Sequence, residues 1–149
     1  MKLRIPVLLL LLGLVSCKAP ASYEQFVRAD QAVEGEYRFP LDLSDSTAVY
    51  DISLYTRVDP SPMASSRGDG QLGITVSWFS AGSEPVLRET VYLPRGGEKG
   101  SSALYRSGVK PSPTGEWLIV AEPVGAPEGL RGVGIICRKK NAHGTRQTP

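Results

Sequence analysis

The side chains best suited to covalent chemistry are the two cysteines, Cys17 and Cys137. An ionised thiol is the strongest nucleophile among the common side chains, and a lipid donor can alkylate it. Cys17 stands at the abrupt end of the most apolar run of the chain, residues 5–15, which follows Lys2 and Arg4. Cys137 lies among aliphatic residues near the C-terminus. These settings predict a modified Cys17 and a buried, unreactive Cys137.

The apolar run 5–15 has the length of a secretory signal core, whereas a spanning helix needs about 20 apolar residues. The tetrapeptide LVSC at 14–17 resembles the lipobox of bacterial lipoproteins. This resemblance implies a signal peptide over residues 1–16, a diacylglycerol on the Cys17 thiol and acylation of its amine, with palmitate as the expected acyl group. At roughly 0.8 kcal/mol per buried methylene, two or three chains make an effectively permanent anchor in membrane lipid.

The same residues predict where the protein resides. Lys18 follows the acylated cysteine, so the acidic residue that retains enterobacterial lipoproteins in the inner membrane is missing. No acidic run follows either, which favours a periplasm-facing position over the alternative of surface display. We expect a lipid-anchored protein of the bacterial cell envelope, at the outer membrane and facing the periplasm. A plain secretory peptide with an incidental cysteine is the alternative, although a free thiol just past the cleavage site would be unusual in an exported protein.

The remaining residues offer little catalytic chemistry. A Ser-His-Asp or Cys-His system needs a histidine in a structured site, and the single histidine, His143, lies in the polar tail. Zinc needs clustered His and Cys ligands, which the sequence does not supply. Glu34 and Glu36 share one face of a predicted strand; a carboxylate pair can hydrolyse glycosides, but this spacing is more typical of a solvated stripe. We expect a non-enzymatic protein with no catalytic residue, cofactor or metal.

The charge balance argues against a nucleic-acid partner. The chain has 17 Lys and Arg residues against 15 Asp and Glu residues. Lys2 and Arg4 leave with the signal peptide, so 17 minus 2 gives 15 basic against 15 acidic residues, a net charge of zero. No basic patch interleaved with aromatic residues appears.

Two further sequence features could bind a ligand: an RGD tripeptide and a set of aromatic residues. Arg67 to Asp69 form an RGD tripeptide that resembles the integrin-recognition motif, in a loop whose glycines are ordinary turn residues. Sandwich modules bind sugars on exposed aromatic rings, and strand parity or position makes Tyr55, Phe79, Tyr92 and Tyr105 candidates. Aromatic rings are also common on sheet surfaces, so carbohydrate binding remains the alternative function.

Apolar and polar residues alternate along most of the chain, as they do in half-buried strands. Strand-like segments lie at 33–43, 48–58, 71–79, 86–93, 116–124 and 130–140, with a weaker one at 103–105. We expect the first two segments to form an antiparallel hairpin across a short polar turn, and the third and fourth to form another. Pro40 cannot donate to a ladder, which predicts that its strand lies at a sheet edge or is bulged there.

Seven to eight short strands without a helical stripe predict an all-β fold. We expect an antiparallel β-sandwich, Ig-like or jelly-roll-like, over residues 33–140, with a partly open barrel as the alternative. Residues 17–32 are predicted to be a lipidated N-terminus and tether, and residues 141–149 a disordered tail. One inter-sheet core is expected from the inward positions Tyr37, Phe39, Ile52, Leu54, Ile74, Val76, Trp78, Ile119, Val133 and Ile135.

The succession of these segments is similar to that of the GldH family, lipoproteins of the Bacteroidetes named for gliding motility. The resemblance runs from the lipobox through YRFPLDLSDSTAVYDISLYTRV at 37–58 and LGITVSWFSAGSEPVLRETVYLP at 72–94 to TGEWLIV at 114–120 and GLRGVGI at 129–135. It implies a tethered, non-enzymatic accessory or interaction module with envelope protein partners, associated in gliding members with the motility and secretion apparatus. It supplies no catalytic residues.

Overall fold

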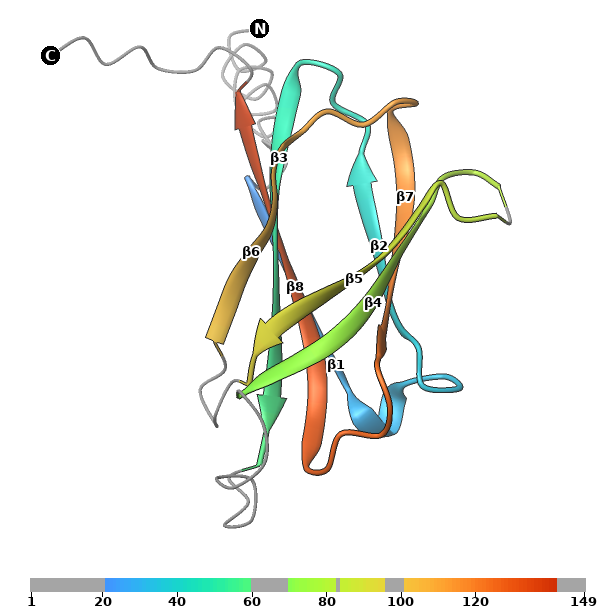
Figure 1. The fold of residues 1–149 in the computed structure, drawn as a ribbon. Helices are drawn as coiled ribbons and strands as arrows, with labels where there is room; N and C mark the ends of the chain where they lie inside the picture. The colour runs from blue at the N-terminus through green and yellow to red at the C-terminus, as the bar shows by residue number, and fades with distance from the viewer. Residues whose placement is uncertain (1–20, 60–69, 83, 96–100, 142–149) are drawn as a thin grey trace, which may run out of the picture.

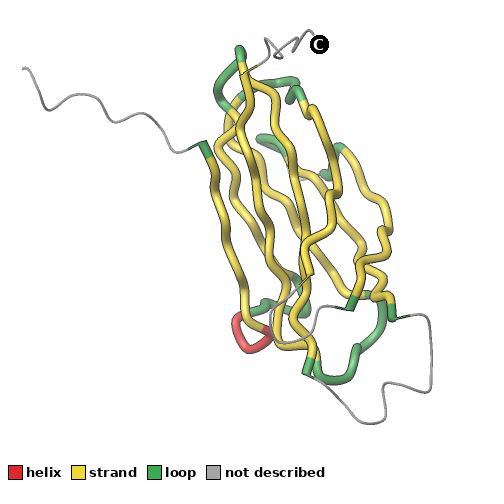
Figure 2. Tube along the Cα trace, turned by 90° about the vertical axis from the view of Figure 1, so that its left-hand side faces the viewer, coloured by secondary structure: helices red, strands yellow, loops and turns green. Residues whose placement is uncertain are grey.

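The computed structural model describes residues 21–59, 70–82, 84–95 and 101–141, which form two antiparallel four-stranded sheets (Figure 1). The strands run along the long axis of the molecule (Figure 2). Their bounds are β1 Ser22–Arg28, β2 Tyr37–Leu43, β3 Ala48–Val58, β4 Gln71–Phe79, β5 Leu87–Pro94, β6 Ser101–Val109, β7 Gly115–Pro123 and β8 Leu130–Asn141. A 3-10 turn, η1 Ala29–Gln31, follows β1.

The order of the strands is that of a jelly roll. One sheet has the order β1-β8-β3-β6 and the other β2-β7-β4-β5, so successive strands change sheet at every connection except the one between β4 and β5. Eight strands in two sheets with these crossings are the jelly-roll form of the sandwich. The predicted all-β sandwich is therefore confirmed, and the alternative of a partly open barrel is wrong.

The core lies between the two sheets, and its members on β2 and β4 follow the alternation of apolar and polar residues. In β2 every second residue is buried, and β4 buries Leu72, Ile74, Val76 and Trp78 on the same side. The ten positions expected to form one inter-sheet core all belong to the observed core cluster. Its members come from both sheets, so the described strands contain a complete apolar interior.

The predicted tether over residues 17–32 is wrong from Ser22 onward, and so is the predicted start of the sandwich at residue 33. Residues 22–28 form β1, which pairs antiparallel with β8 in a register that sets Val27 opposite Val133. The sequence of β1 lacks clear alternation because β1 is an edge strand with most residues exposed. Val27 packs against the core, which gives the strand an apolar contact that its pattern did not reveal.

The predicted hairpin of 33–43 with 48–58 is also wrong, because β2 and β3 belong to different sheets. Their polar connection carries the chain from one layer to the other. The strand begins at Tyr37, and Glu34 and Gly35 instead form a tight turn closed by a bridge between Val33 and Glu36. Glu34 and Glu36 are therefore not a stripe on a strand. The second hairpin, β4 with β5, is confirmed, and β2 is an edge strand as Pro40 predicts.

The tight turn before β2 gives a stability prediction. Both central residues have positive φ, 56° at Glu34 and 83° at Gly35, a conformation that asparagine adopts more readily than glutamate. Glu34→Asn is expected to raise the free energy of unfolding by about 0.5 to 1 kcal/mol in urea denaturation. Glu84→Asn, in another exposed loop, is the control and should change it by less than about 0.5 kcal/mol. An equal gain from both variants would contradict the strain at Glu34.

Several predicted features lie outside the described residues. These are Cys17 and the whole signal segment, the RGD tripeptide at 67–69, His143, and the tail beyond Asn141, where β8 ends. Among the residues that the structure describes, no helix has the length and apolar character needed to cross a bilayer.

Candidate functional site

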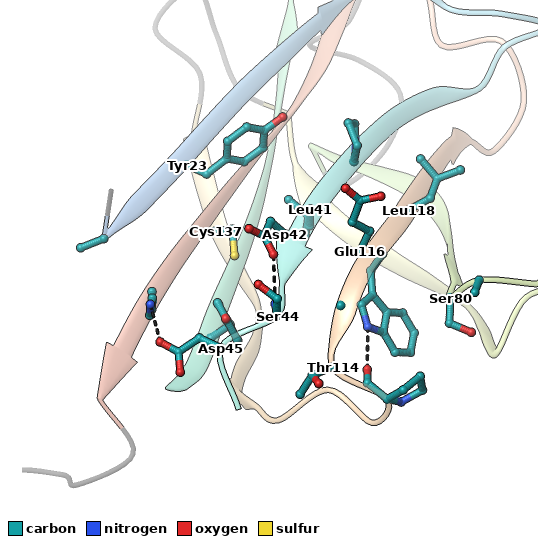
Figure 3. Close-up of a pocket in the computed structure, with 18 residues that line it drawn as sticks. Tyr23, Leu41, Asp42, Ser44, Asp45, Ser80, Thr114, Glu116, Leu118 and Cys137 are labelled. Carbon is teal, nitrogen blue, oxygen red and sulfur yellow. Dashed lines mark hydrogen bonds and ion pairs between the residues drawn. The ribbon is translucent and has the colours of Figure 1, made fainter. Parts of the chain in front are cut away.

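A cavity of about 920 Å³ opens between the two sheets at the end where the described chain begins (Figure 3). Its apolar wall comes from both layers: Tyr23 and Cys137 lie on the β1-β8 side, and Leu41 and Trp117 on the β2-β7 side. β1 and β2 are the edge strands of their sheets, so the cavity lies along one open flank of the sandwich.

Two carboxylates at the rim of this cavity, Asp42 and Asp45, are held by local hydrogen bonds. Asp45 pairs with Lys139 at 2.5 Å, and the carboxylate of Asp42 accepts the backbone N–H of Ser44 at 3.1 Å. The hydrogen bond with Lys139 holds the pKa of Asp45 well below its usual range, and Ser44 lowers the pKa of Asp42. Both carboxylates therefore stay ionised near neutral pH and are poor general acids or bases.

Cys137 is a free, buried cysteine, as its aliphatic surroundings predict. It points into the interior from β8 opposite Tyr23, with 6% of its surface exposed. Burial raises the pKa of the thiol to about 11, because the thiolate loses hydration. Cys137 is thus an unreactive thiol at physiological pH.

The Cys137 thiol gives a second testable expectation. In a Cys17→Ala chain, Cys137 is the only thiol. A shift of the pKa from 9.0 to about 11 reduces the thiolate fraction about a hundredfold at pH 8. Iodoacetamide should accordingly alkylate the native protein at least about a hundredfold more slowly than the same protein in urea, as followed by mass spectrometry. Equal rates in the two states would contradict the burial of this side chain.

A second, smaller cavity of about 360 Å³ lies on the opposite flank, between the edge strands β5 and β6. Trp78 and Trp117 line it and contact each other edge to face, with ring centroids 5.9 Å apart. Val86 and Leu87 line it too, and 62% and 37% of their surfaces are exposed. We call this cavity the tryptophan slot.

A hydrogen-bond network beside the tryptophan slot connects the two sheets. The indole N–H of Trp78 donates to the hydroxyl of Tyr105 at 2.9 Å, and that hydroxyl donates to Glu89 at 2.6 Å. Arg106 donates to the same carboxylate at 2.5 Å. Hydrogen bonds from Tyr105 and Arg106 lower the pKa of Glu89, so this residue remains an anion that holds β6 against β5.

The structure separates the four aromatic residues that were candidates for sugar binding. Tyr92 is 68% exposed on β5 opposite Gly73, and Phe79 lies six residues further along β4, which is about 20 Å at strand spacing. Tyr105 turns inward to Trp78. Tyr55 belongs to the other sheet. A flat platform for a sugar ring needs neighbouring exposed aromatic rings, and these four do not provide one.

The expectation that Tyr55 is exposed is wrong, since only 5% of its surface is accessible. Its ring lies over Gly134 of β8 and stacks with Phe26 of β1 at a centroid distance of 5.8 Å. Its hydroxyl donates a hydrogen bond to the carboxylate of Glu24 at 3.0 Å. The guanidinium of Arg57 lies 4.6 Å from the Phe26 ring centroid. Strand parity correctly sets Tyr55 on the outer side of its sheet, but the ring is covered there.

Within the described ranges there is no group of three or more His, Cys, Asp or Glu side chains that could hold a metal ion, and no buried side-chain nitrogen or oxygen is without a hydrogen bond. The larger cavity and the tryptophan slot, both within the described part of the chain, each lie beside a pair of sheet edges. Arg106 and Lys110, which line the tryptophan slot, were not singled out from the sequence, where isolated cations carry no signal.

Comparisons of the chain with protein-family models, with curated proteins and with solved structures give no match.

Proposed function

We propose that the chain is a membrane-anchored lipoprotein of the bacterial envelope that acts without catalysis, as an accessory or interaction module. The observation that carries this proposal is LVSC at 14–17, which directly follows the apolar run 5–15. A thiol at that place suits alkylation by a lipid donor, and two or three acyl chains hold a protein at a membrane effectively permanently. Location at the outer membrane, facing the periplasm, is part of the proposal.

The start of the folded domain fits a short anchor. β1 begins at Ser22, five residues after Cys17. Five extended residues span at most about 18 Å, so a lipid on Cys17 would keep the sandwich close to the bilayer surface. The flank bearing the larger cavity, which Ala21 helps to line, would then lie nearest the membrane.

An interaction role is supported over carbohydrate binding by the scattered positions of Tyr55, Phe79, Tyr92 and Tyr105, together with the edge strands that end each of the two sheets. The resemblance to the GldH family adds a specific form of this proposal, in which the partners belong to a gliding-motility or secretion apparatus. Crosslinked recovery of the full-length lipoprotein from its own envelope, beside a glycan array, separates the two roles. Saturable glycan binding abolished by Tyr92→Ala would overturn the interaction role.

Metabolic labelling with a clickable fatty acid tests the anchor. The wild-type chain should be labelled and should sediment with membranes, whereas Cys17→Ala should lose the label completely, because no thiol remains at the lipidation position. Cys137→Ala is the matched control, since it removes the only other cysteine and should leave labelling unchanged. Equal labelling of wild type and Cys17→Ala would reject the lipoprotein proposal.

A further inference from the structure

The four sheet edges differ in how well they are protected against pairing with another strand. β2 carries Pro40 in its middle, and β5 ends in Pro94 and carries two charged residues. β1 also has two charged residues. β6 has nine residues without proline, exposes 62% of Leu104, and has Arg106 as its single charged residue. Proline and charge are common means of blocking an edge, and β6 has the least of both among the described edge strands. Its pairing with β3 is irregular around Ile52, so its regular ladder covers residues 101–104.

The tryptophan slot is continuous with this edge. Its lining includes Arg106, Ser107 and Val109 of β6 as well as both tryptophans. A volume of about 360 Å³ is at the lower end of the range for ligand sites, which is about 300 to 1,000 Å³, so the slot suits one large apolar side chain. The exposed apolar side chains of Val86 and Leu87 at the slot would lose water contact when such a group enters.

The charge near the slot favours an anionic neighbour for that apolar side chain. Lys110 lines the slot and forms no ion pair with a carboxylate in the part of the chain that the structure describes. Arg106 also lines the slot. Its side chain is 42% exposed and forms an ion pair with Glu89. A carboxylate of a partner would therefore meet at least one uncompensated cation here.

We propose that the free edge of β6 and the tryptophan slot together bind an extended protein segment. In this segment a large apolar residue and an acidic residue are two positions apart, in either order. Backbone hydrogen bonds to β6 would extend its sheet by one strand, and the apolar side chain would enter the tryptophan slot and pack against the outer edges of Trp78 and Trp117. Residues two apart share a face of a strand, which brings the carboxylate towards Lys110. This inference rests on the interaction role proposed above and names the chemistry of the partner.

The two tryptophans of the chain both line the slot, and Trp117 also lines the larger cavity. A change in their emission that is lost in Val86→Asp therefore reports occupancy of the slot. The full-length lipoprotein in detergent is used to select from a phage-displayed library of linear octapeptides. We expect enrichment of an aromatic or large aliphatic residue two positions from Asp or Glu. A synthetic peptide of that consensus should shift the tryptophan emission saturably. Absence of a consensus after selection would overturn the proposal.

Variants and a modified peptide test each part of the site. Lys110→Glu and Val86→Asp should each weaken peptide binding at least tenfold, whereas Arg138→Glu, an exposed charge reversal on β8, should leave it unchanged. N-methylation of alternate peptide amides should abolish binding, because it removes the donors for the β6 edge. Binding that survives N-methylation, or that is insensitive to both variants, would overturn the docking mode.

A lipid occupant is the competing outcome. Quenching of tryptophan emission by brominated phospholipids in vesicles carrying the lipoprotein, relieved by Val86→Asp, would overturn the peptide site in favour of membrane contact. Failure of this docking site can be distinguished from failure of the proposed function. Failure of peptide binding with successful recovery of envelope partners would remove this docking site and leave the interaction role, whereas loss of fatty-acid labelling concerns Cys17 alone.

Discussion

Trp78→Ala is expected to lower the free energy of unfolding by about 3 to 5 kcal/mol, the usual cost of truncating a large buried aromatic residue. Trp78 has 6% of its surface exposed, packs edge to face on Trp117, and donates its indole N–H to Tyr105. Truncation removes the apolar contact and leaves the network around Glu89 without one of its donors. Urea denaturation monitored by circular dichroism measures the change.

Two variants separate packing from other causes. Tyr92→Ala removes an aromatic ring of the same sheet that is 68% exposed, and it should change the stability by less than about 0.5 kcal/mol. Trp78→Phe keeps an aromatic ring but loses the indole N–H, so its cost should lie between those of the two alanine variants. Equal costs for Trp78→Ala and Tyr92→Ala would contradict the inward position of Trp78.

The core of this protein was predictable because period-two alternation depends only on neighbouring residues. Tyr37 and Phe39 on β2, and Ile74 and Val76 on β4, could be assigned to one apolar side without knowledge of the topology. Pro40 likewise located an edge, because a residue without an N–H cannot serve an interior strand. Both the core positions and the edge strand thus depend on residues that are close together in the sequence.

The pairing of strands was less predictable, because a polar turn shows where a strand ends and not which sheet the chain enters next. The segment Ser44 to Thr47 looks like a hairpin turn but crosses between layers. In β1, Phe26 stacks on Tyr55 at the outer surface of its sheet, so its burial depends on a residue 29 positions away. The burial of Tyr55 in turn depends on Gly134, which leaves space for the ring.

The candidate binding site was the least predictable part. Trp78 was recognised as a core residue, but the tryptophan slot also needs Trp117, Val86 and Lys110, which are brought together only by the crossing of the chain between sheets. Single cations and loop valines have no sequence pattern that marks them as a site. The contribution of such residues follows from tertiary structure alone.

Gly132→Ala is expected to destabilise the protein by about 3 kcal/mol and to loosen β1, the first strand that the structure describes. A Cβ at Gly132 would lie 2.3 Å from the backbone oxygen of Val27 and 2.5 Å from the Phe26 ring. Rotation of a side chain cannot relieve the contact with a backbone oxygen, so β1 would have to move away from β8. Hydrogen exchange of residues 22–28, together with urea denaturation, measures both effects.

Gly134 provides the matched comparison because its obstacle is a side chain. A Cβ there would lie 2.1 Å from Cζ of Tyr55, a ring that can swing outward or be removed. In a Tyr55→Ala background, Gly134→Ala should therefore cost less than about 0.5 kcal/mol. Gly132→Ala should keep most of its cost in a Phe26→Ala background, since the Val27 carbonyl remains. Rescue of Gly132→Ala by Phe26→Ala would show that the ring, and not the close approach of β1 to β8, is the constraint at this position.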